Sequence, residues 1–154
     1  MPYNDWNPPH SHDPNPEPPS DDPTLTIFAN DQILRLTPQY LATLPQAEVR
    51  DCYIVSTGHG TSGPFAFKGV RLLELADRYT KNIWAFLDVI SGDGFRTRLR
   101  REDLVAMGDR PAILSLAIDG RPLERIEGLV RLIVPNESDD ALRQVKWVSE
   151  IRVY

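Results

Sequence analysis

The stretch IWAFLDVISGDGFRTRL, residues 83–99, carries the clearest fold signal in the chain. Residues 83–90 are almost continuously apolar, which indicates a buried strand. Residues 91–94 read Ser-Gly-Asp-Gly, a turn sequence, and apolar and basic residues alternate from Phe95 to Leu99. The stretch therefore predicts a β-hairpin whose second strand presents Arg96, Arg98 and Arg100 on one face.

Strands are predicted on both sides of this hairpin, with short helices between them. The apolar alternation on either side of Asn30-Asp31 indicates another hairpin. The other predicted strands are Val49–Ser56, Ala112–Ile118, Leu129–Val134 and Val145–Tyr154, and the predicted helices are Pro38–Leu44, Val70–Tyr79 and Glu102–Met107. Because strands and helices do not alternate regularly, we expect an α+β fold of mixed β-sheets, with roughly seven strands and three short helices.

Composition predicts one folded domain behind a tail. Residues 1–23 hold eight of the 14 prolines with polar residues between them, so they cannot bury enough apolar area to offset the entropy of ordering. We expect this segment to be a disordered proline-rich tail. Residues 24–154 are of single-domain size, and the chain's 41% hydrophobic content suffices for a core.

Charge and hydropathy exclude two classes of function. A formal net charge of -5 and a pI of about 5.1 argue against binding nucleic acid, which requires a concentrated basic surface. No run approaches the roughly 20 apolar residues of a membrane span, and the N-terminus lacks the basic and apolar regions of a signal peptide. We therefore expect a soluble cytoplasmic protein that binds no nucleic acid.

A glycine-rich segment, Gly58 to Pro64, is predicted to be a loop. Its glycines allow a ligand to approach the backbone closely, so Gly58 and Gly60 are candidate binding residues, together with Ser56 at the end of the preceding strand. His59 is chemically suited to acid-base catalysis or to donating a hydrogen bond to an oxyanion. The alternative for His59 is an ordinary solvated loop histidine.

Five short motifs stand in order across nearly all of residues 25–154. They are Phe67-Lys68-Gly69-Val70-Arg71-Leu72-Leu73-Glu74-Leu75, Ser91-Gly92-Asp93-Gly94-Phe95, Gly120-Arg121-Pro122-Leu123, Gly128-Leu129-Val130-Arg131-Leu132-Ile133-Val134-Pro135 and Val145-Lys146-Trp147-Val148. In pattern and order they resemble the sulfite-oxidase-type oxidoreductase molybdopterin-binding domains. The resemblance implies packed mixed sheets, a pyranopterin-dithiolene cofactor that holds molybdenum, and two-electron oxygen-atom transfer on a small oxyanion or sulfoxide. It also implies an electron-transfer partner.

The resemblance further implies a cysteine thiolate that ligates molybdenum from the strand Val49–Ser56. Cys52 is the only cysteine of the chain and is thus the candidate metal ligand. In the family pattern this ligand stands nearer Val55, Ser56 or Thr57. A lone cysteine within an apolar strand is also typical of core packing. If Cys52 is a core residue, the alternative function is a non-catalytic binding or interaction module that keeps the fold.

The remaining candidate residues follow from the chemistry of an anionic pterin. Arg131 and Lys146 are candidate donors to the cofactor phosphate. Asp93 is a candidate acceptor for pterin nitrogens, although it also suits a plain turn. Arg98, with its neighbouring arginines, is predicted to attract a small anionic substrate, and we pair it with His59 as a catalytic candidate. The alternative for these arginines is a solvated strand face.

Overall fold

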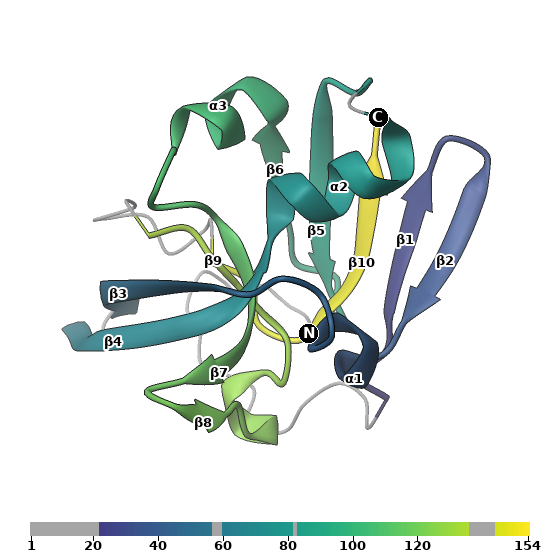
Figure 1. The fold of residues 1–154 in the computed structure, drawn as a ribbon. Coiled ribbons are helices and arrows are strands. Elements are labelled where there is room, and N and C mark those ends of the chain that lie inside the picture. The colour runs from purple at the N-terminus through teal and green to yellow at the C-terminus, as the bar shows by residue number, and fades with distance from the viewer. Residues whose placement is uncertain (1–21, 57–59, 82, 136–143) are drawn as a thin grey trace, which may run out of the picture.

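The computed structural model describes residues 22–56, 60–81, 83–135 and 144–154, and these form two β-sheets (Figure 1). The predicted tail therefore lies almost entirely outside the described residues. The first sheet, sheet A, has the strand order β2-β1-β10-β5-β6. Its strands are β1 (Leu25–Ala29), β2 (Gln32–Leu36), β5 (Phe86–Ser91), β6 (Arg96–Arg100) and β10 (Val148–Val153). Strands β1 and β10 run parallel and the other pairs antiparallel, which confirms the predicted mixed sheets.

The predicted central hairpin is the pair β5 and β6, but its first strand begins at Phe86 rather than at Ile83, which is 80% exposed. Phe86 lies opposite Arg100 and Ile90 lies opposite Arg96, so the arginines share the face that the sequence predicted. Strand β5 is buried from Leu87 to Ser91, as expected of its apolar run. The outer strand β6 exposes its arginines and buries Leu99, because only one of its faces packs against the core.

The second sheet, sheet B, has the order β3-β4-β7-β8, with β9 also paired to β7. Its strands are β3 (Ala47–Ser56), β4 (Gly60–Arg71), β7 (Ile113–Ile118), β8 (Arg121–Pro122) and β9 (Arg131–Ile133). Figure 1 shows β3 and β4 extending together away from sheet A. Sheet B carries part of the predicted glycine-rich loop in β4 and Arg131 in β9.

The predicted glycine-rich loop is wrong for residues 60–64, which belong to β4. Glycine and proline make this strand hard to recognise in the sequence. Strand β3 pairs with the backbone of β4 from Gly60 onward, and β7 pairs with β4 from Phe67 to Arg71. Gly69 shows how closely β4 is packed: a Cβ atom there would lie 1.9 Å from the carbonyl oxygen of Leu114. Neighbouring strands thus override the weak local strand propensity of this segment.

Three short helices are α1 (Pro38–Leu41), α2 (Leu72–Thr80) and α3 (Arg101–Ala106). Helix α1 begins as predicted, since the Thr37 hydroxyl accepts a hydrogen bond from the backbone N–H of Tyr40 at 3.1 Å. It ends at Leu41 rather than at the predicted Leu44. Helix α2 buries one side against the core and exposes the other.

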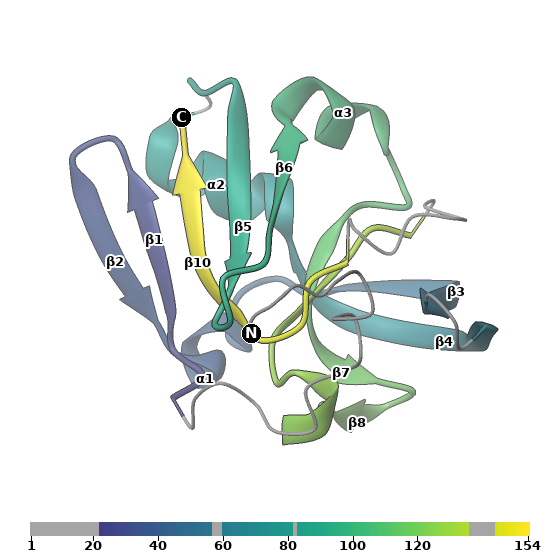
Figure 2. The same cartoon turned by 180° about the vertical axis from the view of Figure 1, so that it is seen from behind.

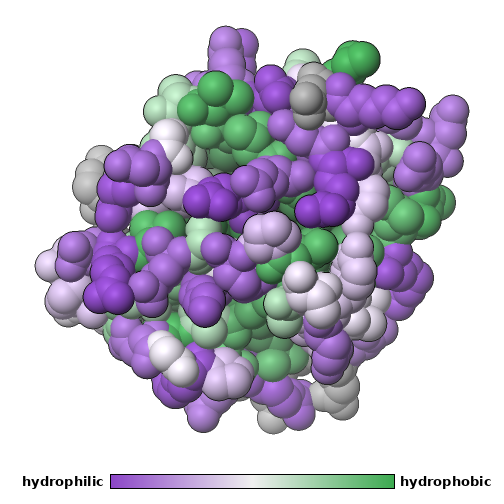
Figure 3. Space-filling model, in the orientation of Figure 1, coloured by the Kyte–Doolittle hydropathy of each residue, from purple (hydrophilic) through white to green (hydrophobic). Residues whose placement is uncertain are grey.

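Two hydrophobic clusters stabilise this arrangement. The main cluster lies under α2, which covers one face of sheet A in Figure 1 and passes behind that sheet in the reverse view (Figure 2). A second cluster lies on sheet B and consists of Ala47, Val49, Cys52, Phe67, Ile113, Ile118, Leu123 and Ile133. The surface on the α2 side is mostly hydrophilic, with separate hydrophobic patches (Figure 3).

Candidate functional site

Arg131 lies inside sheet B with part of its hydrogen-bonding capacity unused. It is the first residue of β9, opposite Ser115 of β7, and only 7% of its surface is exposed. Its Nε is buried and has no hydrogen-bond partner among the described residues. Burial lowers the pKa of Arg131 to about 10, so the guanidinium stays charged at neutral pH. A buried charged donor without a partner is costly, which points to a missing anion.

Glu127 is the acidic residue whose charge acts on Arg131, and it is already paired with another arginine. Its two carboxylate oxygens accept hydrogen bonds from the guanidinium of Arg121, each at 2.7 Å. Glu127 also accepts the backbone N–H of Glu124 in a capping box at the 3-10 turn η2 (Arg125–Glu127). This pairing lowers the pKa of Glu127 to about 2. The carboxylate of Glu127 is therefore engaged by Arg121 and compensates only part of the charge of Arg131.

Lys146 is the second cation of this region. It follows the bridge between Val145 and Leu132, whose backbone N–H donates to the Val145 carbonyl at 2.8 Å. Lys146 is half-buried, and its pKa is lowered first by burial and then by the charge of Arg131, while Glu127 acts in the opposite direction. The charge of Arg131 thus lowers the proton affinity of Lys146, an effect that a bound anion would oppose.

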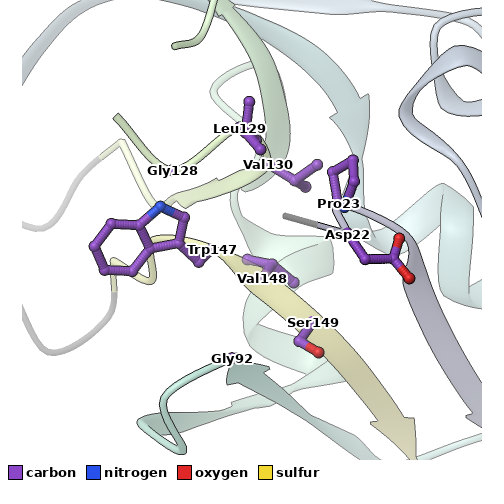
Figure 4. A pocket seen from close by; sticks show the side chains of 9 residues that line it. All are labelled: Asp22, Pro23, Gly92, Gly128, Leu129, Val130, Trp147, Val148 and Ser149. Atoms are coloured by element: carbon purple, nitrogen blue, oxygen red, sulfur yellow. The ribbon is translucent and has the colours of Figure 1, made fainter. Parts of the chain in front are cut away.

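The chain beside these cations contains a small pocket of about 70 Å³ (Figure 4). Its walls are residues 128–130, residues 147–149, Gly92, and Asp22 with Pro23. Leu129 and Trp147 both adopt left-handed backbone conformations, with φ of 55° and 51°. Such strain in residues that carry a side chain is concentrated at functional sites. The pocket is smaller than the roughly 300 Å³ of a typical ligand site, so it can take only one edge of a large cofactor.

Gly128 sets the close approach of these two walls. Its φ is 106°, and a Cβ atom there would lie 3.0 Å from the backbone nitrogen of Trp147 and 3.1 Å from the Cβ of Lys146. The Trp147 indole N–H donates to the carbonyl of Arg125 at 2.8 Å. The segment that carries Lys146 is therefore held against the segment that leads into Arg131.

Asp93 is occupied within its own turn. Its Oδ1 accepts a hydrogen bond from the Ser91 hydroxyl and another from the backbone N–H of Phe95 at 3.2 Å. The neighbouring Gly92 donates its N–H to the Trp147 carbonyl at 2.9 Å and lines the pocket. The turn therefore borders the site, while the role of Asp93 toward a pterin stays a prediction.

Arg98 lies in sheet A and has protein partners. It donates to both carboxylate oxygens of Asp88, at 2.8 and 3.1 Å, and its guanidinium lies 4.1 Å from the centre of the Phe86 ring. Asp88 is only 1% exposed, so Arg98 and the adjacent Arg96 compensate a buried carboxylate. These contacts explain Arg98 without a ligand, and its catalytic role stays a prediction.

The predicted residues at the end of the β3–β4 hairpin are only partly described. Gly58 and His59 lie outside the described residues. Ser56 pairs through its backbone with Gly60, which has a φ of 78° and open space where a Cβ would stand. The binding and catalytic roles assigned to these four residues stay predictions.

Cys52 lies in the second hydrophobic cluster and is 3% exposed. A regular strand would place Arg50 on the same face as Cys52. The structure instead has a register shift between Val49 and Cys52, with Asp51 at a φ of 56°, so Arg50 and Asp51 both point outward. Cys52 therefore shares the buried face of Val49.

A comparison with protein-family models decides the family. The family model described as "Oxidoreductase molybdopterin binding domain" matches residues 21–154. The chain belongs to this family. Among solved structures, a sulfane dehydrogenase, SoxCD from Paracoccus pantotrophus, is similar over 85% of this chain with a TM-score of 0.63 and 18% identity. This chain spans 38% of that chain, and the likeness shows a shared fold. No curated protein matches the chain.

The predicted resemblance and the molybdopterin-binding fold are thus confirmed. Domains of this family bind molybdopterin, an anionic cofactor that ends in a phosphate. The paired cations Arg131 and Lys146, and the orphaned Nε of Arg131, fit that phosphate end. In the described residues there is no cluster of three or more His, Cys, Asp or Glu side chains that could hold a metal by itself, and no helix long and apolar enough to cross a membrane.

Sequence reasoning found the two cations of this molybdopterin-binding domain but missed Glu127, whose charge acts on both. Glu127 and Arg121 come together only through the turn η2 and the short strand β8. The spacing of Glu124 and Glu127, with a following Gly128, is the one local signal that could have indicated the turn.

Proposed function

We propose that this chain is the cofactor domain of a sulfite-oxidase-type oxidoreductase and that it holds molybdopterin by the phosphate, between Arg131 and Lys146. The observation that carries the proposal is the buried Nε of Arg131, which has no partner among the described residues. A phosphate oxygen would accept from it and remove the cost of a buried, unpaired charged donor.

Each cation has a distinct part in this binding. Arg131 is fixed by its strand, so its planar donors present one geometry to the anion with little further loss of entropy. Lys146 adds a mobile ammonium group from the facing segment. Burial around both removes water from the site, and this strengthens their attraction for a phosphate.

The cofactor, when bound, supplies two-electron oxygen-atom transfer, and we propose a small oxyanion or sulfoxide as the substrate. Acceptance of the electrons by a separate partner protein and a cytoplasmic location belong to the same proposal. His59 is the proposed acid-base group, because the imidazole of an unperturbed histidine titrates near neutral pH. Arg98 is the proposed group that attracts the anionic substrate.

The test is cofactor content after expression in a molybdenum-replete host that makes molybdopterin. Wild-type protein is expected to carry molybdenum, measured by elemental analysis, together with pterin, measured by fluorescence after oxidation and extraction. Arg131→Met and Lys146→Met are each expected to lower the retained pterin at least about tenfold, the worth of one charge-assisted hydrogen bond.

Arg78→Met is the matched control, since Arg78 is exposed on α2 and lies outside the proposed site. It should retain wild-type cofactor content. The apoproteins give a second measurement, because inorganic phosphate should raise the melting temperature of wild-type and Arg78→Met proteins but not of Arg131→Met. A wild-type protein that carries neither molybdenum nor pterin would refute the proposal.

A further inference from the structure

The chain has one cysteine, and its backbone is shaped to keep that thiol inside the protein. Two register shifts in the β3–β4 pairing bracket Cys52, one on each side. The first turns Arg50 and Asp51 outward together, so that Cys52 returns to the buried face. The strand is therefore irregular at the place where regular alternation would have changed the direction of the sulfur.

Strand β4 closes the space beside Cys52. Gly63 lies so near that a Cβ atom on it would stand 2.7 Å from the Cys52 carbonyl oxygen. Phe65 pairs with Cys52 across the two strands, and Phe67 lies beside it in the same cluster. To expose the sulfur, β3 would have to rotate against a backbone with no spare room.

Two backbone contacts of the sulfur suit a protonated thiol. Its Sγ lies 3.6 Å from the Val49 carbonyl and 3.7 Å from the Arg50 carbonyl, so the single S–H has two acceptors within reach. A thiolate, which is the form that binds metals, has no proton to donate to these oxygens. Burial raises the pKa of Cys52, and this outweighs the charge and the side-chain hydrogen bond of Arg110, which both act in the opposite direction.

We infer that Cys52 is a packing residue, and that this chain supplies no thiolate to molybdenum when it binds the cofactor. The inference rests on the proposed function, because it concerns the metal end of a cofactor whose phosphate end lies at Arg131 and Lys146. The dithiolene of the cofactor then supplies two sulfurs to molybdenum, and the chain supplies none. The ligand assigned to Cys52 from the sequence is replaced by oxygen donors or by a group from outside the chain.

The decisive measurement is the number of sulfur atoms around molybdenum in the loaded protein, by X-ray absorption at the molybdenum edge. Wild type, Cys52→Ala and Cys52→Ser are each expected to show the same sulfur number and equal molybdenum and pterin contents. If wild type has one more sulfur per molybdenum than both variants, Cys52 is a ligand and the inference is overturned. A third sulfur that persists in both variants comes from outside the chain and supports it.

Alkylation of the apoprotein tests the inference without any cofactor. Cys52 in the native apoprotein should react with iodoacetamide at least about 100-fold more slowly than in the urea-unfolded chain, because reaction requires the core to open. Fast alkylation that is suppressed on loading with cofactor would overturn the inference. Slow alkylation in a protein that never retains pterin would refute the proposed function and leave Cys52 as a core residue.

Discussion

Replacing Arg131 with methionine should stabilise the apoprotein while it abolishes cofactor binding. Burial lowers the pKa of Arg131 to about 10, and a drop of this size corresponds to about 3 kcal/mol of unfavourable free energy in the charged form. Methionine keeps a long flexible side chain, removes the charge and leaves no orphaned donor. We expect the free energy of unfolding to rise by about 1–3 kcal/mol, since the lowered pKa already includes the compensation by Glu127.

Urea unfolding of the two apoproteins at pH 7, followed by circular dichroism, measures this gain as a shift in the midpoint at constant slope. When the two proteins are expressed with the cofactor, the order should reverse, and wild type should retain more pterin than Arg131→Met. Arg78→Met removes a charge from an exposed helix position and should change stability by no more than about 0.5 kcal/mol. If Arg131→Met lost more than about 1 kcal/mol in the apoprotein, Arg131 would be structural, and the reasoning from its unpaired Nε would fail.

Three further predictions concern the framework of the site. The folded-state pKa of Glu127 is about 2 against a usual 4.5, so its ion pair stabilises the protein above pH 4.5 and is lost as the pH falls toward 2. Urea unfolding should therefore show that the stability difference between wild type and Glu127→Gln shrinks over that range. A difference that does not depend on pH would contradict this. Gly69→Ala should cost about 2–4 kcal/mol or prevent folding, because the new methyl group would clash with the Leu114 carbonyl. Gly108→Ala, with open space and a φ of 59°, should cost about 1 kcal/mol. Thermal melts with similar losses for both variants would refute the packing argument. Asp88→Asn should cost about 1–2 kcal/mol in urea unfolding, since it weakens the hydrogen bonds from Arg98 and removes the ion pair with Arg96. No change would show that these contacts are not formed in solution.

The glycine-rich segment shows the limit of local sequence reasoning about the fold. Residues 86–99, the cap at Thr37 and residues 148–153 of the terminal strand follow local rules of burial period and turn chemistry, and the structure confirms them. Residues 60–64 follow no such rule. They form a strand because β3 supplies partners for their backbone, and a partner that lies elsewhere in the chain leaves no mark in the segment itself.

The candidate site divides in the same way. The motif order identified the family, and it named Arg131 and Lys146 as the basic residues toward the cofactor. It did not reveal that the Nε of Arg131 is buried without a partner, or that Arg121 engages the carboxylate of Glu127. Those facts depend on a turn and two short strands that place residues of different motifs side by side.

By itself, then, the sequence determined the mixed α+β architecture, the family and the existence of a single thiol, because these depend on periodicity, motif order and composition. Only the tertiary structure decided the direction of that thiol. An irregular stretch of β3 reverses the side-chain alternation at Asp51, and the packing of β4 at Gly63 holds Cys52 in the core. Such an irregularity is set by the fit between two strands, so no count of residues along one strand could have predicted it.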